Sequence, residues 1–487
     1  MESSPTAPSD QKQWKVGTLT YTKAGLLGLF AWLLWGDFCF TIMEQVIPSI
    51  MPLKFKELGA SNTLMALIMT SVPSLLSTVF NPIISFRSDR TRTKWGRRIP
   101  YLLGTVPFLS FALLALGVQG PVGGWIQSVA STWFSGLSMP TVLLIYICFF
   151  LLIFNFFNIF VSCIFWYFFN DVVPEKLMAR FVSWFRIVNA GASTLYNWFI
   201  FKHAETHFME IFIGAAVLYL IGFGLMCVMV KEGKYAPPPE NIGNKKGAVA
   251  SVKTYFTECM TIRHYWFLYL TTFGGAITGS ANLYIIFQQR YLGLDLEHIG
   301  KLSAINNISY IVWIAILGFL ADRYHPLRIT IIGKIAALCL APLGLIWLFW
   351  KPSAEVVFYF YAVLGMVGTT AIGALQAIVE IPLLMRIFPR AQYGQYCSAR
   401  AMCGSFFGIT AGATTGVILD HLYGKFGDRV YLFLPFWSIA GLSITIVCLF
   451  LLYRSWQQYG GFEHYVAPIP GHQKDRQPPQ NCPAGVS

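Results

Sequence analysis

The chain has 487 residues, of which 55% are hydrophobic and only 12% are charged, and its formal net charge is +13. Ordinary soluble domains carry about 25% charged residues, so this composition excludes a typical globular protein and indicates a lipid environment. The positive charge is expected in loops at the membrane surface, and no nucleic-acid partner is expected.

The chain begins with a polar tail, residues 1–23, which lacks the apolar core and cleavage site of a signal peptide. Twelve apolar segments follow, and each is long enough for a spanning helix of about 20 residues. They cover residues 24–50, 62–86, 99–119, 141–169, 181–201, 209–230, 264–289, 300–321, 328–350, 355–385, 396–419 and 430–453. The expected fold class is therefore an all-α polytopic membrane protein with twelve transmembrane helices.

Polar stretches divide these segments into two groups of six. We expect one bundle at 24–230 and another at 264–453, joined by a cytoplasmic linker at 231–263 and followed by a Pro-rich cytoplasmic tail at 454–487. Residues 120–140, between the third and fourth segments, are rich in Gly and Ser and carry no charge. They are expected to form an outer loop with an interfacial turn.

The distribution of Lys and Arg gives the orientation. With both termini in the cytoplasm, and with Arg328 and Lys301 at the ends of their segments counted with the adjacent loops, 24 of the 35 fall on the inner side and 8 on the outer side. The remaining three, Arg186, Lys334 and Arg400, lie inside spans. The positive-inside rule therefore predicts cytoplasmic termini, in a plasma membrane or, if the source is a bacterium, its inner membrane.

Two short patterns occur at corresponding places in the two halves. The stretch 85–90 after the second segment resembles 318–323 after the eighth, and 174–183 before the fifth resembles 389–398 before the eleventh. Six-helix repeats related by a pseudo-two-fold axis are typical of transporters whose substrate site lies at the repeat interface near mid-membrane.

The first three segments and the loop between the second and third carry the most specific motifs. These are Gly36-Asp37-Phe38, Asn81-Pro82, Thr91-Arg92-Thr93-Lys94-Trp95-Gly96-Arg97 and Pro100-Tyr101. They resemble the major facilitator superfamily and, within it, the glycoside–pentoside–hexuronide cation symporters, which include the melibiose permeases and have plant sucrose transporters as relatives. The resemblance implies the two-bundle facilitator fold, transport of a sugar or glycoside by alternating access, and no cofactor beyond a coupling ion, H⁺ or Na⁺.

The sequence departs from that family in the second and fourth segments. The family has two carboxylates one turn apart where this chain has Ser77 and Asn81, and a further carboxylate aligns with Ser162. These differences weigh against the usual sodium site, although Ser77 and Asn81 remain candidates for cation coupling. They favour proton coupling through another acid, or facilitated diffusion.

Ionisable side chains inside a span are costly and indicate a transport pathway. Asp37, flanked by Trp32 and Trp35, is predicted to bind the substrate or the coupling cation, and the structural alternative is an ion pair with Arg186. Arg186 is either a substrate contact or that ion-pair partner. Glu44, two turns further along, is either an outer relay for the cation or merely interfacial.

Neutral and aromatic side chains complete the predicted substrate site, namely Asn158, Trp166 and Gln376. Each has an ordinary alternative, because amides often join helices and aromatic rings often pack together. Glu380 and Arg400 lie nearer the inner face, where a gate or a structural salt bridge is expected.

A conformational role is predicted for charged residues of the inner loops: Asp89, Arg90, Arg97, Asp322 and Arg323. The acid of the first of these loops can face the positive N-terminal end of the eleventh helix and stabilise the outward-open state. Its counterpart in the second half is expected to act in the same way on the fifth helix.

No enzymatic motif occurs in a plausible context. The ten cysteines form no metal or disulfide pattern, and there is no phosphate-binding loop or nucleophile elbow, so neither an enzyme nor a metal site is expected. Two other functions remain open, a carrier of a lysophospholipid or another amphipathic solute, and a non-transporting sensor that kept the fold. A monomer is expected, with the lipid bilayer and a small solute as its partners.

Overall fold

The computed structural model describes residues 14–132, 138–234, 259–279, 284–350, 352–389, 393–461 and 465–468. Apart from one short hairpin, these residues form helices and connecting turns. Helices are expected of apolar segments in lipid, because each backbone N–H and C=O has to find its partner within the segment.

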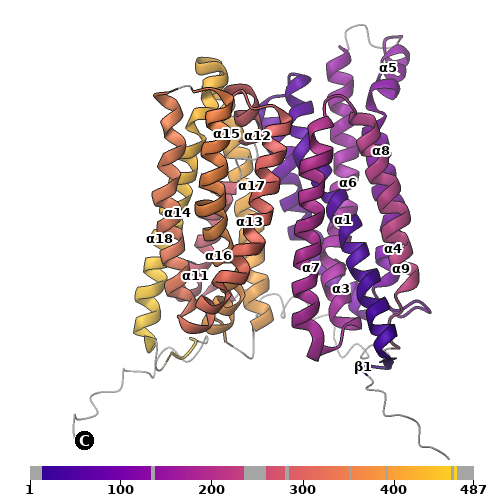
Figure 1. Ribbon diagram of the computed structural model, residues 1–487, viewed down its shortest axis with the longest axis vertical. Helices are drawn as coiled ribbons and strands as arrows, with labels where there is room; N and C mark the ends of the chain where they lie inside the picture. The colour runs from indigo at the N-terminus through magenta and orange to yellow at the C-terminus, as the bar shows by residue number, and fades with distance from the viewer. Residues whose placement is uncertain are drawn as a thin grey trace, which may run out of the picture. The chain divides into compact units, whose positions relative to one another are not determined.

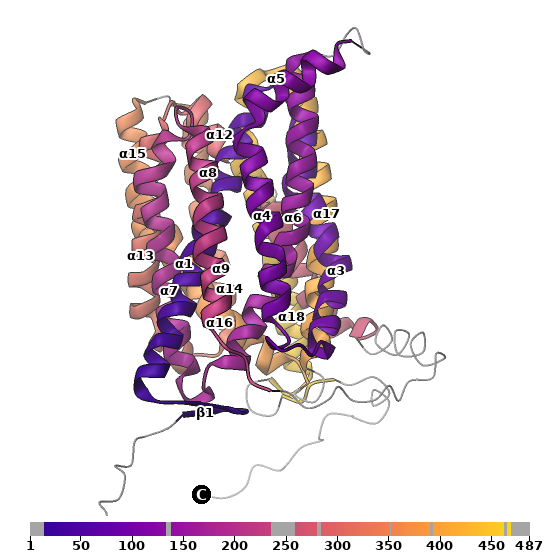
Figure 2. The same cartoon turned by 90° about the vertical axis from the view of Figure 1, so that its right-hand side faces the viewer.

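The first six expected spans are all helical. They are α1 (Lys23–Glu57); α2, η1 and α3 (Asn62–Ala66, Leu67–Ser71 and Val72–Arg90); α4 (Ile99–Gly117); α6 (Met139–Val172); α7 and η2 (Glu175–Leu195 and Tyr196–Ile200); and α8, η4 and α9 (Phe208–Leu218, Tyr219–Phe223 and Gly224–Met229). In both views α4 lies beside α6 and α8 (Figure 1 and Figure 2).

The last six spans follow the same pattern. They are α11, α12 and η5 (Arg263–Gly279, Tyr284–Ile286 and Phe287–Tyr291); α13 (Leu296–Arg323); α14 and η6 (Pro326–Leu340 and Ala341–Leu348); α15, η7 and α16 (Ala354–Val363, Leu364–Thr369 and Thr370–Ile387); α17 (Tyr393–Phe426); and α18 (Leu434–Gln458). The all-α fold with twelve transmembrane helices is confirmed.

Length and hydropathy alone pick out fewer spans. In the described part of the chain, nine helical stretches are long and apolar enough to cross a membrane, and one of them, Gln395–Gln458, covers most of α17 and all of α18. The stretches omitted are α7, which carries the charges of Arg180 and Arg186, and α11, which is only 17 residues long.

Two features differ from the expectation drawn from the sequence. The expected outer loop at 120–140 instead begins with a helix, α5 (Gln119–Ala130), on which Trp125 is exposed. The polar N-terminal tail contains an antiparallel hairpin of β1 (Trp14–Val16) and β2 (Leu19–Tyr21). In Figure 2 the hairpin and α5 lie at opposite ends of the same helices. Neither element has the long apolar run on which the sequence prediction was based.

The chain divides into two compact units. Unit 1 contains Met1–Ser61, Leu76–Pro239 and Asp295–Ile308, and unit 2 contains Asn62–Leu75, Glu240–Leu294 and Ser309–Ser487. Each unit therefore takes most of one six-helix group and the first part of one helix from the other group. The bundle boundaries expected from the sequence, at the ends of the linker, stay a prediction.

Within unit 2, the start of the second span packs closely on α17. Gly408, Gly412 and Gly416 recur at every fourth position and face this segment; a Cβ on Gly416 would lie 2.7 Å from the Thr63 Cα. Small residues at this spacing let two helix backbones approach each other. The Asp420 carboxylate of α17 then accepts the backbone N–H groups of Asn62 at 2.7 Å and Thr63 at 2.8 Å, and so caps α2.

A comparable approach occurs in unit 1. A Cβ on Gly300, in the first half of α13, would collide with the backbone oxygen of Asn197 in η2. The glycine therefore allows α13 to lie directly on the backbone of η2. In each unit, the segment that comes from the other six-helix group is therefore packed through a contact that requires glycine.

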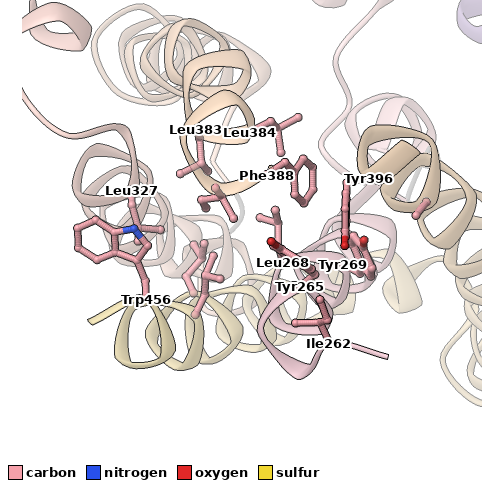
Figure 3. Packing of buried hydrophobic residues seen from close by; sticks show 14 of the residues in the cluster. Ile262, Tyr265, Leu268, Tyr269, Leu327, Leu383, Leu384, Phe388, Tyr396 and Trp456 are labelled. Carbon is pink, nitrogen blue, oxygen red and sulfur yellow. The ribbon is translucent and has the colours of Figure 1, made fainter. Parts of the chain in front are cut away.

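Buried aromatic side chains fill one end of unit 2. Tyr265 and Tyr269 of α11 pack with Phe388 and Tyr396, and Trp456 of α18 lies in the same cluster (Figure 3). The segment 465–468 closes over these residues, because the Tyr465 hydroxyl donates to Ile387 O at 2.8 Å and the Tyr265 hydroxyl donates to Pro468 O at 2.9 Å. The ends of α11, α16 and α18 are therefore held together.

The Asp420 cap predicts a measurable effect on stability. Asp420→Ala removes the acceptor of two backbone N–H groups at the start of α2, and the loss of a cap costs about 1 kcal/mol. The Tm of the purified protein, followed by tryptophan fluorescence, should fall. His421→Ala changes the next, exposed residue of the same helix and should leave the Tm unchanged. Equal Tm values for all three proteins would contradict the cap.

A second prediction concerns pH and His325, in the turn before α14. Its Nδ1 accepts the Leu327 N–H at 3.3 Å and its ring packs on Trp456. Burial, helped by the charges of Arg386 and Arg328, lowers the pKa of His325 from 6.5 to about 4. The folded state therefore prefers the neutral ring, and its stabilising contribution is complete above pH 6.5 and is lost as the pH falls toward 4.

The Tm of the wild-type protein should accordingly fall between pH 6.5 and pH 4. His325→Asn keeps a side chain that can cap the helix but cannot become charged, so its Tm should fall less over the same interval. Parallel Tm curves for the two proteins would show that this histidine does not contribute.

Candidate functional site

Polar side chains recur at every fourth position of α1, at Asp37, Thr41, Gln45 and Ser49. Residues four apart lie on the same face of a helix, so these four form one polar stripe along an otherwise apolar span. A polar stripe is costly against lipid and is expected to face another helix.

The facing polar groups come from α7 and η2. Three side-chain hydrogen bonds join the two helices: Asn189 to Thr41 at 2.7 Å, Gln45 to Ser193 at 3.3 Å, and Ser49 with Tyr196 at 2.6 Å. We call these six residues, together with Asp37, the polar seam. The seam lies entirely within unit 1 and holds the two helices in a fixed register.

Asp37 differs from the other members of the polar seam. Its side chain is 0% exposed, and neither carboxylate oxygen has a hydrogen-bond partner among the described residues. Thr41 and Asn189 lie close to it, but they bond to each other. An ionised carboxylate buried without a partner costs several kcal/mol. The site therefore favours a carboxyl group that carries a proton or receives a partner from outside.

Arg186 does not supply that partner. It lies on α7, one turn before Asn189, but its side chain is exposed, and no salt bridge joins it to Asp37. The structural alternative for Asp37, an ion pair with Arg186, is therefore absent from this structure. Substrate contact by Arg186 stays a prediction.

Glu44 has different surroundings from Asp37, although both belong to α1. Its side chain is exposed, and Asn158 of α6 lies within hydrogen-bonding reach of its carboxylate. The Asn158 Oδ1 is buried and has no partner among the described residues. The structure thus places Asn158 beside Glu44, and the roles predicted for both residues remain to be tested.

Trp166 of α6 has one packed face and one free side. Its ring centroid lies 5.0 Å from that of Phe185 and 5.9 Å from that of Phe169, yet 49% of the residue is exposed. Packing therefore accounts for part of this side chain, and its predicted contact with the substrate stays a prediction.

Two predicted residues of unit 2 are already engaged with neighbouring helices. Gln376 Nε2 donates to Thr330 O at 3.2 Å and joins α16 to α14. Glu380 and Arg400 form an ion pair, 3.0 Å from Oε1 to Nη2, between α16 and α17. The ion pair is present, whereas its role as a gate stays a prediction.

For the remaining residues predicted to couple a cation or to act in the inner loops, the structure shows few contacts that bear on the predicted role. Ser77 and Asn81 are half-buried on α3, and Arg323 is exposed at the end of α13. The side chains of three further residues lie outside the described part of the structure, namely Asp89, Arg90 and Asp322. Their predicted conformational roles are not tested.

Arg97, also predicted to be conformational, belongs to a charged cluster. Its Nε donates to Asp171 Oδ2 at 2.8 Å, and the Nε of the buried Arg98 donates to the same oxygen at 3.1 Å. Arg98 also bonds the Ser88 hydroxyl, and its guanidinium lies 5.1 Å from the centre of the Tyr167 ring. The basic loop is thus attached to the end of α6.

Glu232, which sequence reasoning missed, completes this cluster. Its carboxylate accepts the backbone N–H groups of Arg98 at 2.9 Å and Ile99 at 3.3 Å, and so caps α4. Burial raises the pKa of Glu232, an effect that these N–H donors oppose. A capping acid more than 130 residues away in sequence leaves no local pattern that could reveal it.

A comparison with protein families identifies the chain. The sequence matches the family described as MFS/sugar transport protein over residues 36–417. The chain belongs to this family. It is therefore a multi-pass membrane transporter of the major facilitator superfamily and not an enzyme, and its substrate is a small molecule. The membership expected from the motifs is confirmed. A search of curated proteins finds no match to the sequence.

Solved structures of other facilitators share the fold. The nucleoside transporter NupG has a TM-score of 0.62 at 14% identity, and the match covers 87% of this chain and 98% of that chain. A D-xylose-proton symporter has a TM-score of 0.59 at 13% identity, with 88% and 96% covered. A bacterial homologue of the human lysosomal transporter Spinster has a TM-score of 0.57 at 13% identity, with 89% and 97% covered. At these identities the likeness shows the fold alone.

The position of Glu232 beside the basic loop requires a glycine at position 96. Its φ is +113°, and a Cβ there would collide with the Glu232 carboxylate. Gly96→Ala should therefore cost about 1–3 kcal/mol and lower the Tm. In contrast, Gly104→Ala adds a Cβ in open space within α4, and a helix interior favours Ala by about 0.5–1 kcal/mol.

The two alanine variants should therefore shift the Tm in opposite directions. Adding Glu232→Ala to Gly96→Ala removes the collision but keeps the strained backbone, so it should restore only part of the loss. An unchanged Tm for Gly96→Ala would contradict the described loop geometry.

Proposed function

We propose that this protein carries a sugar or glycoside across the plasma membrane by alternating access, in symport with protons, and that Asp37 is the group that carries the proton. One observation is the basis of the proposal. Asp37 is fully buried in the middle of α1, and neither of its oxygens has a hydrogen-bond partner among the described residues. Ionisable residues held in this way inside a span mark transport pathways.

The neighbourhood of Asp37 supports a polyhydroxylated solute. Thr41 and Asn189 supply a hydroxyl and an amide next to the carboxyl group. Such groups can exchange their mutual hydrogen bond for bonds to sugar hydroxyls, and a partly exposed ring such as Trp166 can cover the apolar face of a sugar. The family description, MFS/sugar transport protein, points to the same substrate class.

A proton suits the site better than sodium. A hard metal cation requires several oxygen ligands, and Ser77 and Asn81 stand where related symporters have carboxylates. A single carboxyl group is enough for a proton. Binding of the proton removes the cost of a buried charge, so protonation of Asp37 can bias the equilibrium between two conformations.

The orientation of the chain in the membrane is part of the proposal. The excess of Lys and Arg in alternate loops supports cytoplasmic termini. The hairpin β1–β2 and Glu232 belong to the same side, because the Lys234 N–H bonds Thr18 Oγ1 at 2.7 Å.

Uptake into proteoliposomes tests the proposed function. A panel of labelled sugars and glycosides is offered with and without an imposed proton or sodium gradient. The wild-type protein should accumulate at least one of them when the proton gradient is present. Asp37→Asn is similar in size but cannot lose a proton, so accumulation should fall by tenfold or more, to the level reached without a gradient.

Two controls make the result specific. Glu355→Gln neutralises an exposed acid at the start of α15 and should leave accumulation unchanged. Exchange of labelled for unlabelled solute needs no gradient, so Asp37→Asn should retain it. Undiminished accumulation by Asp37→Asn would remove this residue from the coupling mechanism. Binding without movement of any solute would favour a sensor, and uptake only of a lysophospholipid would favour an amphipathic cargo.

A further inference from the structure

Three charged residues lie inside the spans of unit 2, on three different helices. Lys334 belongs to α14, Glu380 to α16 and Arg400 to α17. Each lies about two helical turns from the helix end that belongs to the aromatic cluster of Figure 3. The three residues therefore lie at a similar depth, and we call them the charge cluster of unit 2.

Within the charge cluster, some of the positively charged groups have no hydrogen-bond or salt-bridge partner among the described residues. Arg400 Nη2 pairs with Glu380 Oε1 at 3.0 Å, but Arg400 Nε is buried and has no partner among the described residues. Lys334 is within electrostatic range of both residues but forms no salt bridge in the described structure. The one acid is therefore shared unequally between two cations.

The packing of α14 on α16 keeps Lys334 next to this ion pair. A Cβ on Gly333 would collide with the Gln376 amide, which itself bonds Thr330 O, so the two helices cross directly beside Lys334. Gln376 is neutral and contributes no counter-charge. The Gln376 amide therefore joins the two helices but does not neutralise the positive charge of Lys334.

The cluster as a whole carries one excess positive charge, and part of it is exposed. The Glu380 side chain is 55% exposed and the Arg400 side chain is 25% exposed. Charged groups within a span face the bundle interior or a water-filled cavity, because their exposure to hydrocarbon is costly. A partly exposed cationic site, in which the lysine forms no salt bridge with the residues that the structure describes, is suited to a negatively charged ligand.

We propose that the charge cluster of unit 2 binds an anionic group of the transported solute, a carboxylate or a phosphate. Lys334 and the Arg400 guanidinium attract the anion, and Glu380 competes with it for the two cations. The inference deepens the proposed function, on which it rests for the identity of the cargo, by restricting the substrate to acidic sugars or glycosides.

The direction in which two substitutions change the affinity for an anion distinguishes this role from a structural one. Lys334→Gln removes a positive charge and should weaken binding of an anion, whereas Glu380→Gln removes a competing negative charge and should strengthen it. If the three residues only stabilised the fold, both substitutions would act in the same direction, and they would act equally on neutral and acidic solutes.

The experiment uses the full-length protein in nanodiscs of phosphatidylcholine. The first probe is inorganic phosphate, compared with chloride at equal ionic strength, and the measurement is the Tm. Phosphate should raise the Tm of the wild-type protein and of Glu380→Gln but not that of Lys334→Gln. Arg454→Gln removes an exposed cation from α18 of the same unit and should behave like the wild type.

The second probe is a matched pair, methyl glucoside and methyl glucuronide, which differ in one carboxylate. The wild-type protein should bind the glucuronide about tenfold more tightly or better, as expected for a unit charge at close range. Lys334→Gln should remove that preference without changing the affinity for the glucoside, and Glu380→Gln should enlarge it.

The two probes distinguish the possible failures. If neither glycoside binds but phosphate stabilises the protein through Lys334, the glycoside assignment is wrong and the anion site stands. The anion site is wrong if phosphate has no effect that depends on Lys334, or if the two substitutions change the preference in the same direction. It is also wrong if only nanodiscs containing phosphatidylglycerol stabilise the wild-type protein over Lys334→Gln, because the cluster then binds lipid headgroups.

Discussion

The cost of placing a charge or an unpaired polar group in hydrocarbon determines most of this structure. It explains why the apolar segments are helices and why the polar residues of α1 face those of α7 rather than lipid. The same cost makes exceptions informative. Asp37 breaks the rule in unit 1, where a buried carboxyl group has no hydrogen-bond partner among the described residues, and Lys334 breaks it in unit 2.

The two exceptions are of opposite sign and have different surroundings. Asp37 lies among neutral hydroxyls and amides, which can stabilise a protonated carboxyl group or hydrogen-bond a solute. Lys334 lies beside an ion pair, which keeps a positive charge available for an anion. A carrier that moves an acidic solute together with a proton uses both functions, and one proton with one monovalent anion transfers no net charge across the membrane. The polar seam and the charge cluster of unit 2 are therefore complementary in the proposed mechanism.

The twelve spans could be predicted from the sequence because each is a long apolar run, and the family could be recognised from the motif around Trp95 and Gly96. Asp37 was found for the same reason, as an isolated acid in an apolar segment. Long-range contacts were not predictable. Nothing near Asp420 or Glu232 in the sequence indicates which helix each one caps. The α5 helix and the N-terminal hairpin were missed because they lack a strong hydropathy pattern.

Proton exchange at Asp37 on solute binding is the most direct test of the account. A solute that is transported is added to the purified protein in weakly buffered solution, and the change in pH is recorded. The wild-type protein should take up or release protons when the solute binds, and Asp37→Asn should bind the solute without this exchange. Equal proton exchange by the two proteins would contradict the central claim that the unpaired carboxyl group of Asp37 carries the coupled proton.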